Sequence, residues 1–445
     1  MKLKNIFYRQ RAFSYLPFLF IFHPLMLLAQ NELSLDNAWQ IALTNNYTIQ
    51  QQITLIKKAR EEISIQRTDY YPSLSTSGLL ARAKFDKFPL NLPNASGDVG
   101  LDLLSLSVTQ PIFNGFSTKN LVASAKESMA AQEIRKEMLQ NSVLLEVGNL
   151  YYDIQSNLLK QKILKTSVSR LDNQLTRIHN LYQSEQATPF DTLEVANRKL
   201  QTLNHLATLE NGYRILLSNL HYLLNEENLP PLKPLSDFEQ NFILNEFPFY
   251  MERALQLRPE FKNLSTQKNA KSYYADVLEA RYYPQISASF AYNFMKIHSD
   301  IARQEWSSFY SVLVNVQWEL WNWKRDARKV QQAKLDIRNL EIEEKQLLND
   351  VKHQITTAYE NLQSSANKIK LQKKLVAQEK DRYRITEDRY EQGLATFLDL
   401  NTAELDLTEA ETQLQENYIT WYKNQLHLAF ATGEIGEKFM EVSDE

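Results

Sequence analysis

The sequence of 445 residues contains no cysteine, which excludes disulfides, thiolate metal sites and lipid attachment to an N-terminal cysteine. Only nine glycines are present, far below the average usage of roughly 7%, and this scarcity predicts long uninterrupted helices. The seven histidines lack the His-x-x-x-His or Glu-x-x-His spacing of a helical metal site. There is also no glycine-rich phosphate-binding loop. The composition therefore indicates no enzyme, no metal site and no cofactor.

Long apolar runs are also lacking, apart from one between Ala12 and Leu28. This run follows four basic residues and is interrupted by Pro17 and Pro24, so we expect residues 1–29 to be a secretory signal peptide, with an uncleaved anchor as the alternative. Its removal would change the formal charge from −3 to −7. Such a mildly acidic chain does not have the basic charge typical of a nucleic-acid-binding protein. No other stretch is long enough for a transmembrane helix, so a membrane protein with this sequence would have to span with strands.

The chain contains an internal duplication. The Tyr-Tyr-Pro motif at 70–72 returns at 282–284, an offset of 212 residues. Farther on the offset is 208, and Asp191 returns as Asp399. A repeat of about 210 residues is far longer than a solenoid unit. It predicts two homologous halves related by a pseudo-two-fold.

Each half is predicted to contain a helix, a strand pair and a long helical hairpin. The helix at 33–69 would be capped by Asp36 and stopped by Pro72. An inter-repeat linker rich in proline joins the halves, and an acidic tail is expected to be poorly ordered. The expected boundaries are 30–224 for the first repeat (strand pair 73–113, hairpin 116–224), 225–249 for the linker, 250–432 for the second repeat (strand pair 284–321, hairpin 325–431), and 433–445 for the tail.

Alternating apolar and polar residues predict strands at 73–85, 101–113, 284–295 and 311–320. Such alternation suits a membrane-spanning strand, and it suits equally a soluble hairpin that packs one face on a core. Four strands are too few to close a transmembrane barrel, so several chains would have to share one. Three tryptophans at the end of the last strand are candidates for a membrane-interface girdle: Trp318, Trp321 and Trp323.

The stretches at 116–182 and 325–390 contain no proline, and each would form a helix on the order of 100 Å long. Their apolar residues recur at steps of three and four, which predicts coiled-coil packing on neighbouring helices. After a short break, a second helix returns through 190–224 and 397–431. The predicted fold class is therefore mainly α, with long hairpins and four strands in two repeated halves.

This arrangement resembles the TolC-like outer-membrane efflux protein family over essentially the whole mature chain. The residues that carry the resemblance are the paired Tyr-Tyr-Pro motifs, Pro-Ile-Phe-Asn-Gly at 111–115, and Tyr-Glu-Gln-Gly-Leu-Ala-Thr at 390–396 leading into Asp399. No single motif is very specific. The order of the motifs, the duplication and the signal peptide are specific when taken together.

The resemblance implies a homotrimer in the outer membrane of a Gram-negative bacterium. Four strands per chain would form a shared 12-stranded β-barrel surrounded by outer-membrane lipid, and the hairpins would form an α-barrel that extends into the periplasm. Its tip would meet a periplasmic adaptor (membrane fusion) protein coupled to an inner-membrane transporter of the RND, ABC or MFS type. The chain would then be the passive exit duct of an efflux or type I secretion system.

The resemblance also places a periplasmic aperture at the hairpin tips, where Asp191, Tyr390 and Asp399 match the family's narrowing positions. A trimer would bring six carboxylates to one constriction, and such a ring favours cations. A second interpretation is that both aspartates stabilise helix N-termini through the helix dipole. The two roles are compatible.

The tips depart from the family pattern. Ala395 stands at the usual basic position and Thr402 where a second acidic residue can sit, which disfavours a gate locked by many cross-subunit salt bridges. Glu185 occupies the place that Gly393 holds in the second tip, where a left-handed residue other than glycine costs roughly 1 kcal/mol. Either the first turn differs, or the two tips contact the adaptor unequally. The candidate adaptor contacts are Tyr182, Glu185, Thr188, Gly393 and Thr396.

A soluble periplasmic coiled-coil scaffold or adaptor is the alternative from another class. An adaptor typically carries one long hairpin beside β-rich domains, whereas this sequence predicts two hairpins. A scaffold would need neither the strand pairs nor the tryptophan cluster. We therefore favour the duct, and the sequence names no particular substrate for it.

Overall fold

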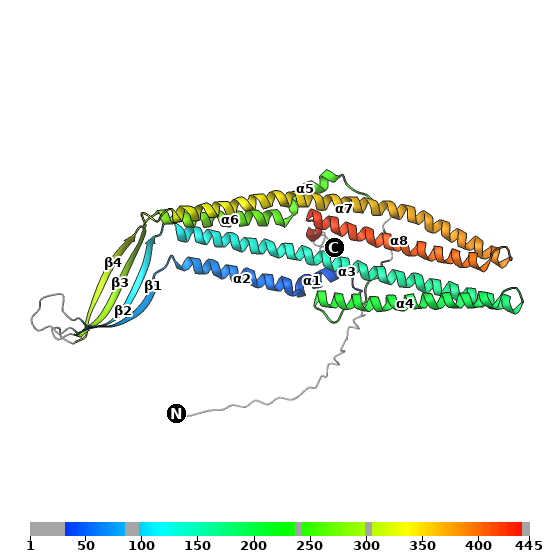
Figure 1. Cartoon of the computed structure of the whole chain (residues 1–445), viewed down its shortest axis with the longest axis horizontal. Coiled ribbons are helices and arrows are strands. Elements are labelled where there is room, and N and C mark those ends of the chain that lie inside the picture. The colour runs from blue at the N-terminus through cyan, green and yellow to red at the C-terminus, as the bar shows by residue number, and fades with distance from the viewer. Residues whose placement is uncertain (1–31, 85–97, 236–237, 239–241, 299–304, 438–445) are drawn as a thin grey trace, which may run out of the picture.

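The computed structural model describes residues 32–84, 98–235, 238, 242–298 and 305–437. The protein is elongated, with a β-sheet at one end and the turning ends of two helical hairpins at the other (Figure 1). The predicted signal peptide and the last eight residues lie outside the described residues. Within the described ranges, no helix combines the length and the apolar character needed to cross a membrane.

Apart from one 3-10 turn in the second half, the two halves use the same elements in the same order. The first half consists of α1 (Leu35–Asn45), α2 (Tyr47–Thr68), β1 (Ser73–Lys84), β2 (Asp98–Phe113), α3 (Ser117–Gln183) and α4 (Pro189–Leu224). The second half consists of α5 (Phe247–Leu257), α6 (Pro259–Glu279), a 3-10 turn η1 (Ala280–Tyr282), β3 (Gln285–His298), β4 (Ser307–Gln317), α7 (Arg325–Glu391) and α8 (Phe397–Thr432).

The hairpins repeat residue for residue. Both α3 and α7 contain 67 residues, and both α4 and α8 contain 36. At about 1.5 Å per residue the longer helices span on the order of 100 Å. The predicted fold class, with long hairpins, four strands and two repeated halves, is confirmed.

The predicted single helix at 33–69 is wrong, because the chain breaks at Asn46 and the apolar periodicity runs through the break. The second half breaks at the equivalent residue, Arg258, and the backbone angles are nearly the same (φ −64°, ψ 123° and φ −65°, ψ 121°). The proline that follows Arg258 disfavours helical angles there. At the start of α1 the cap is Ser34 rather than Asp36.

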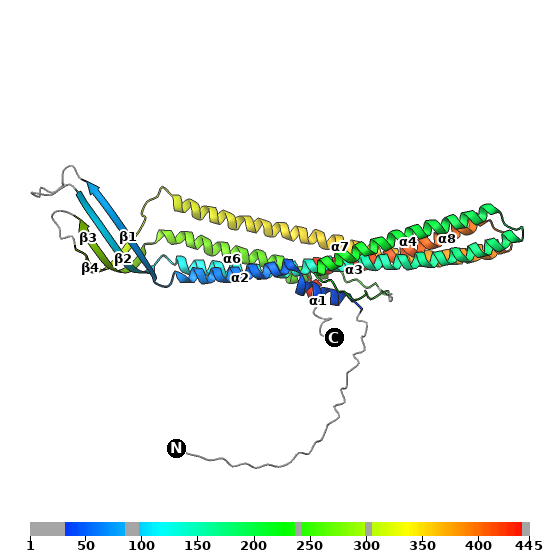
Figure 2. The same ribbon diagram turned by 90° about the horizontal axis from the view of Figure 1, so that it is seen from below.

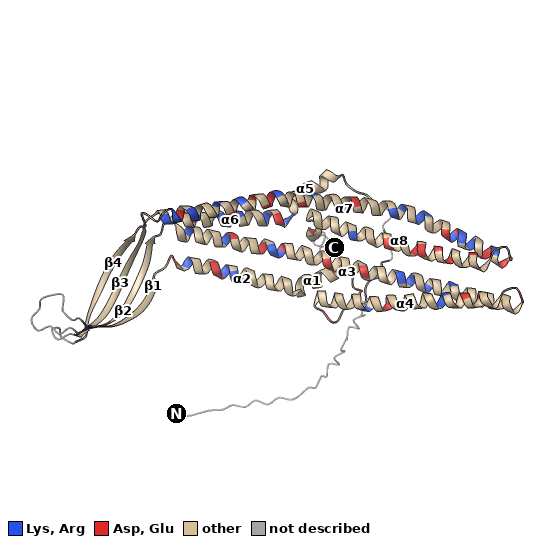
Figure 3. Cartoon of the chain, in the orientation of Figure 1, with Lys and Arg blue, Asp and Glu red and all other residues tan. Residues whose placement is uncertain are grey.

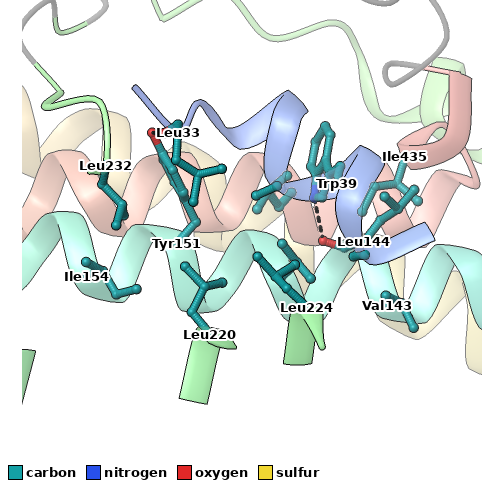
Figure 4. Packing of buried hydrophobic residues seen from close by; sticks show 14 of the residues in the cluster. Leu33, Trp39, Val143, Leu144, Tyr151, Ile154, Leu220, Leu224, Leu232 and Ile435 are labelled. Atoms are coloured by element: carbon teal, nitrogen blue, oxygen red, sulfur yellow. Dashed lines mark hydrogen bonds between the residues drawn. The ribbon is translucent and has the colours of Figure 1, made fainter. Parts of the chain in front are cut away.

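A cluster of buried apolar side chains lies where α1, α3 and α4 meet the linker (Figure 4). Trp39 is almost fully buried, and its indole Nε1 donates to the Leu144 carbonyl oxygen at 2.8 Å. The linker joins the same cluster through Leu232, and the Leu33 amide donates to the Pro231 carbonyl oxygen at 2.8 Å. Apolar packing and a backbone hydrogen bond therefore hold the linker against this cluster.

The four strands form one antiparallel sheet in the order β1-β2-β3-β4, so that the halves join through β2 and β3. Ser75 lies opposite Ser107, and Phe290 opposite Val312, which keeps polar and apolar residues on separate faces. The predicted strand pair at 284–321 is too long, because β4 ends at Gln317.

The first residues of the expected acidic tail belong to the fold. Arg253 forms ion pairs with Glu434 at 2.7 Å and with Glu437 at 2.6 Å. Between them, Ile435 is fully buried in the central cluster. These contacts tie the end of α8 to α5.

Candidate functional site at the hairpin tips

Both hairpins turn at the same end of the protein, opposite the sheet (Figure 1, Figure 2). The two turns have the same geometry. Glu185 has φ +59° and Gly393 has φ +71°. In the first turn the Gln186 amide donates to the Leu181 carbonyl oxygen at 2.9 Å, and the equivalent bond closes the second turn at 2.8 Å. The expectation that the first turn could differ is therefore wrong, because Glu185 adopts the left-handed conformation itself.

Each return helix begins with a capping box. The carboxylate of Asp191 accepts from the Thr188 amide at 2.9 Å, and the Asp191 amide donates to the Thr188 hydroxyl at 3.3 Å. Asp399 and Thr396 make the same pair of bonds at 2.8 and 3.2 Å. The two aspartates thus stabilise helix N-termini through these bonds as well as through the dipole. The Thr-x-x-Asp spacing was the sequence signal for this role.

The cap bonds also act on the charge of the second aspartate. The Thr396 hydroxyl and then the Thr396 amide hold the pKa of the Asp399 carboxyl below its usual value. Asp399 therefore remains ionised at neutral pH. A capping role and a negative charge coexist in this residue.

Tyr390 is part of a small apolar cluster beneath the tips. Its ring lies 6.3 Å from that of Phe397, edge to face, beside the buried side chains of Ile178 and Val195. Burial, and then the charge of Asp191, raise the pKa of the Tyr390 phenol. The equivalent Tyr182 in the first hairpin is exposed. The structure therefore brings Tyr390, but not Tyr182, into the packing that holds the tips together.

A polar network that the sequence analysis missed links the two hairpins farther from the turns than this apolar cluster. Glu404 of α8 has a side chain only 1% exposed, and its carboxylate lies 3.2 Å from the Arg170 guanidinium of α3. Ser167 and Thr408 also donate to this carboxylate, at 2.7 and 2.8 Å. Arg170 reaches Glu411 at 3.4 Å as well. Sequence spacing gives no sign of this network, because its two helices are more than 230 residues apart.

A second link lies between α3 and α7, closer to the tips. Arg177 pairs with Glu387 at 3.1 Å and also with Glu391. The Tyr383 hydroxyl receives a bond from Gln174 at 3.3 Å, and burial raises the pKa of Tyr383. Both polar links therefore join the first hairpin to the second.

The predicted site residues fall into two groups at opposite ends of the protein. The tip residues surround the turns, whereas the three tryptophans lie beyond the end of β4, where the sheet meets the helices. Trp318 donates to the Tyr282 carbonyl oxygen at 3.1 Å, and the rings of Trp321 and Trp323 lie 5.7 Å apart. The rings of all three tryptophans are exposed on the surface of the chain. Their place at a membrane interface stays a prediction.

The model of the outer membrane efflux protein family matches residues 38–226 and 250–434. The chain belongs to this family. The two matched segments correspond to the two structural repeats. The family consists of transport channels, so this efflux protein is an outer-membrane channel and not an enzyme.

Solved structures share the fold at low sequence identity. The structure of CusC, described in terms of folding and transmembrane channel formation, has a TM-score of 0.77 and 14% identity, and the match covers 91% of this chain and 92% of that one. VceC from Vibrio cholerae has a TM-score of 0.74 at 15% identity, with coverage of 90% and 96%. CmeC from Campylobacter jejuni has a TM-score of 0.74 at 15% identity, with coverage of 92% and 89%. None of the curated protein sequences compared with the chain matches it.

Proposed function

We propose that three copies of this chain form the passive exit duct of a tripartite export system, with the strands in the outer membrane and the hairpins in the periplasm. The observation that carries the proposal is the open four-stranded sheet with one apolar face. Its outer strands, β1 and β4, have no further strand beside them within the described residues. Unpaired edges and an exposed apolar face are both unfavourable in water, and a shared 12-stranded barrel in lipid removes both.

The hairpins support the same assembly. Exposed apolar side chains recur seven residues apart on α4, at Leu193 and Leu200 and again at Ile215 and Tyr222. In the tip-side half of α7, Leu371 and Ile385 are exposed two heptads apart. Heptad stripes of this kind pack against partner helices. In a ring of three copies, α4 of one chain would meet the second hairpin of the next.

The tips would form the aperture and the contact with the rest of the system. Asp191 and Asp399 from three copies would supply six carboxylates to the narrow end, with Tyr390 packed behind them. A ring of negative charge favours cations over anions. The exposed tip residues would contact a periplasmic adaptor coupled to an inner-membrane transporter, and these residues are Tyr182, Glu185, Thr188, Gly393 and Thr396.

The test is single-channel conductance of the purified, signal-cleaved protein in a planar bilayer. The informative variant is Asp191→Asn/Asp399→Asn, because an asparagine oxygen still accepts the cap bond while the charge is gone. We expect a cation-preferring wild type and a loss of cation preference in this double variant. Asp191→Ala/Asp399→Ala removes charge and cap together and reports the additional effect of loosened tips.

Each result assigns a role. Conductance with unchanged selectivity in the asparagine variant would keep the duct and leave the aspartates as helix caps only. Folded protein that neither inserts nor conducts would contradict the duct and favour a periplasmic scaffold. A matched control is Lys374→Gln/Lys380→Gln, which changes the charge of α7 away from the turns and should leave selectivity unchanged.

A further inference from the structure

The charged residues of the sheet are confined to the strand ends far from the helices, whereas charged residues of both signs cover the helices (Figure 3). The remaining length of the strands carries none. A separation this sharp requires a reason, because an exposed sheet in water has no need to exclude charge from most of its length. The charged strand residues are Arg82, Lys84, Asp98, Asp102 and Lys296.

Arg82, Asp102 and Lys296 all lie on the apolar face of the sheet, because residues paired across neighbouring strands share a face. Side chains alternate along a strand, so Asp102 shares a face with Leu104 and Leu106 of β2. On β3, Lys296 continues the row of Phe294 in the same way. The charges therefore stand at the outer end of the face that the duct would turn toward lipid.

Asp102 is the centre of a compact cluster. Its Oδ1 lies 2.6 Å from Nη1 of Arg82, and its Oδ2 lies 2.6 Å from Nε2 of His298. The Asp102 side chain is only 13% exposed, whereas that of Arg82 is 57% exposed. The carboxylate is thus shielded while the guanidinium faces outward.

Gly100 makes this convergence possible. A Cβ at this position would lie 2.8 Å from Cδ of Arg82 and 3.0 Å from Cβ of His298. Any larger residue would push the two basic side chains apart. The cluster is therefore built by the backbone as well as by its side chains.

Among the side chains that the structure describes around Asp102, positive charge exceeds negative charge. Asp102 lies opposite Lys296 in the strand register, so one shielded carboxylate adjoins two cationic side chains as well as His298. Within the described part of the chain, Nη2 of Arg82 and the Lys296 ammonium make no hydrogen bond or ion pair. Lys84 lies opposite Asp98 in the register and is left out of the site.

The height of the cluster matches a membrane surface. Ten residues of β3 separate Ile286, at the start of the apolar row, from Lys296. They span about 34 Å along the strand, which is about 26 Å along the membrane normal at the usual tilt of a barrel strand. Outward-facing apolar bands are about 25 Å tall. Trp306, exposed just before β4, marks the same level with an interfacial aromatic side chain.

We propose that Arg82 and Lys296, held around Asp102, bind the phosphate groups of an anionic glycolipid in the outer leaflet of the membrane. This inference rests on the proposed function for the direction of the strands. Guanidinium and ammonium groups are the usual donors to phosphate oxygens, and the guanidinium contacts them through two N–H groups. The site would fix the rotation and depth of the barrel in the outer leaflet.

Native mass spectrometry of the trimer, released from detergent, tests the site directly. The probes are a truncated lipopolysaccharide whose lipid carries two phosphates and the same lipid after enzymatic dephosphorylation. We expect wild type to retain the phosphorylated lipid preferentially, and Arg82→Gln/Lys296→Gln to lose that preference roughly thirtyfold, since each basic group near an anionic surface contributes about fivefold. Arg82→Lys/Lys296→Arg should keep it, as should the control Lys374→Gln/Lys380→Gln.

Three results would overturn the inference: equal retention of both lipids by wild type, an unchanged preference in the glutamine variant, or abolition of the preference by millimolar inorganic phosphate, which would indicate a free-anion site. Conductance of the same preparations separates this inference from the proposed function. A wild type that conducts normally but shows no preference for the phosphorylated lipid counts against the lipid site alone. A wild type that fails to insert counts against the duct.

Discussion

At the scale of single residues, the two tip turns pose a matched experiment that the chain itself supplies. Glu185 and Gly393 occupy equivalent places and both have positive φ, but only glycine adopts that conformation without a steric cost. For glutamate the cost is about 1 kcal/mol. The strain persists in the first tip because the hydrogen bonds of the turn require this backbone.

Replacing Glu185 by glycine should stabilise the first tip by about 1 kcal/mol, because the left-handed conformation no longer opposes a Cβ. The measurement is hydrogen exchange at the Gln186 amide, which donates to Leu181 within the turn. Exchange should slow by roughly fivefold.

The opposite change in the second tip is the control. A Cβ at Gly393 would meet nothing within 4 Å, so Gly393→Ala alters only backbone strain. Exchange at the Leu394 amide should become faster by a similar factor. Unchanged exchange in both variants would show that the φ values do not limit tip stability.

At the scale of elements, the hairpins depend on polar links as much as on apolar packing. The buried Glu404 carboxylate between α3 and α8 is favourable only while Arg170 remains beside it, because an unpaired buried charge is costly. An exposed pair on one helix, such as Arg338 with Glu341, contributes far less. The two cases predict very different mutational costs.

Arg170→Met should destabilise the contact between hairpins by roughly 3–5 kcal/mol, since it leaves Glu404 buried without its partner. The double variant Arg170→Met/Glu404→Leu should recover most of this loss. Thermal unfolding followed by helix circular dichroism, together with hydrogen exchange along α8, measures both effects.

Arg338→Met is the matched control and should cost at most about 0.5 kcal/mol. A single variant at Arg170 as mild as this control would mean that solvent reaches Glu404 in the assembled protein. A double variant no better than the single one would assign the loss to packing rather than to charge.

At the scale of the whole molecule, the exposed heptad stripe of α4 requires a partner that one chain does not provide. Leu193→Glu/Leu200→Glu should prevent three copies from associating, because charges would enter a helix–helix seam. Size-exclusion chromatography with light scattering would then find monomers in detergent. Ile243→Glu, at a linker side chain 85% exposed, is the control and should leave the trimer intact. If the Leu193→Glu/Leu200→Glu variant formed trimers as the Ile243→Glu control does, the proposed packing of the hairpins would be contradicted.

Much of the fold could be predicted because it follows from local patterns and from the duplication. The scarcity of glycine and the absence of proline from 116–182 and 325–390 predicted the long helices, and the duplication predicted the same elements in both halves. The break at Asn46 escaped prediction because its apolar periodicity continues unbroken, and only the cap geometry reveals it. At the tips, the matching positions located Asp191 and Asp399, and the Thr-x-x-Asp spacing carries the capping boxes that the backbone forms.

By itself the sequence determined the two halves, through their repeated motifs, and also the long helices and the alternation of the strands, because helix and strand patterns depend on residues near in the chain. Only the tertiary structure decided which side chains meet across hundreds of residues. It placed Arg170 beside Glu404, and it gathered Arg82 and His298 around Asp102 over a glycine. Such pairs depend on how helices and strands lie against one another, and no spacing along the chain encodes that arrangement.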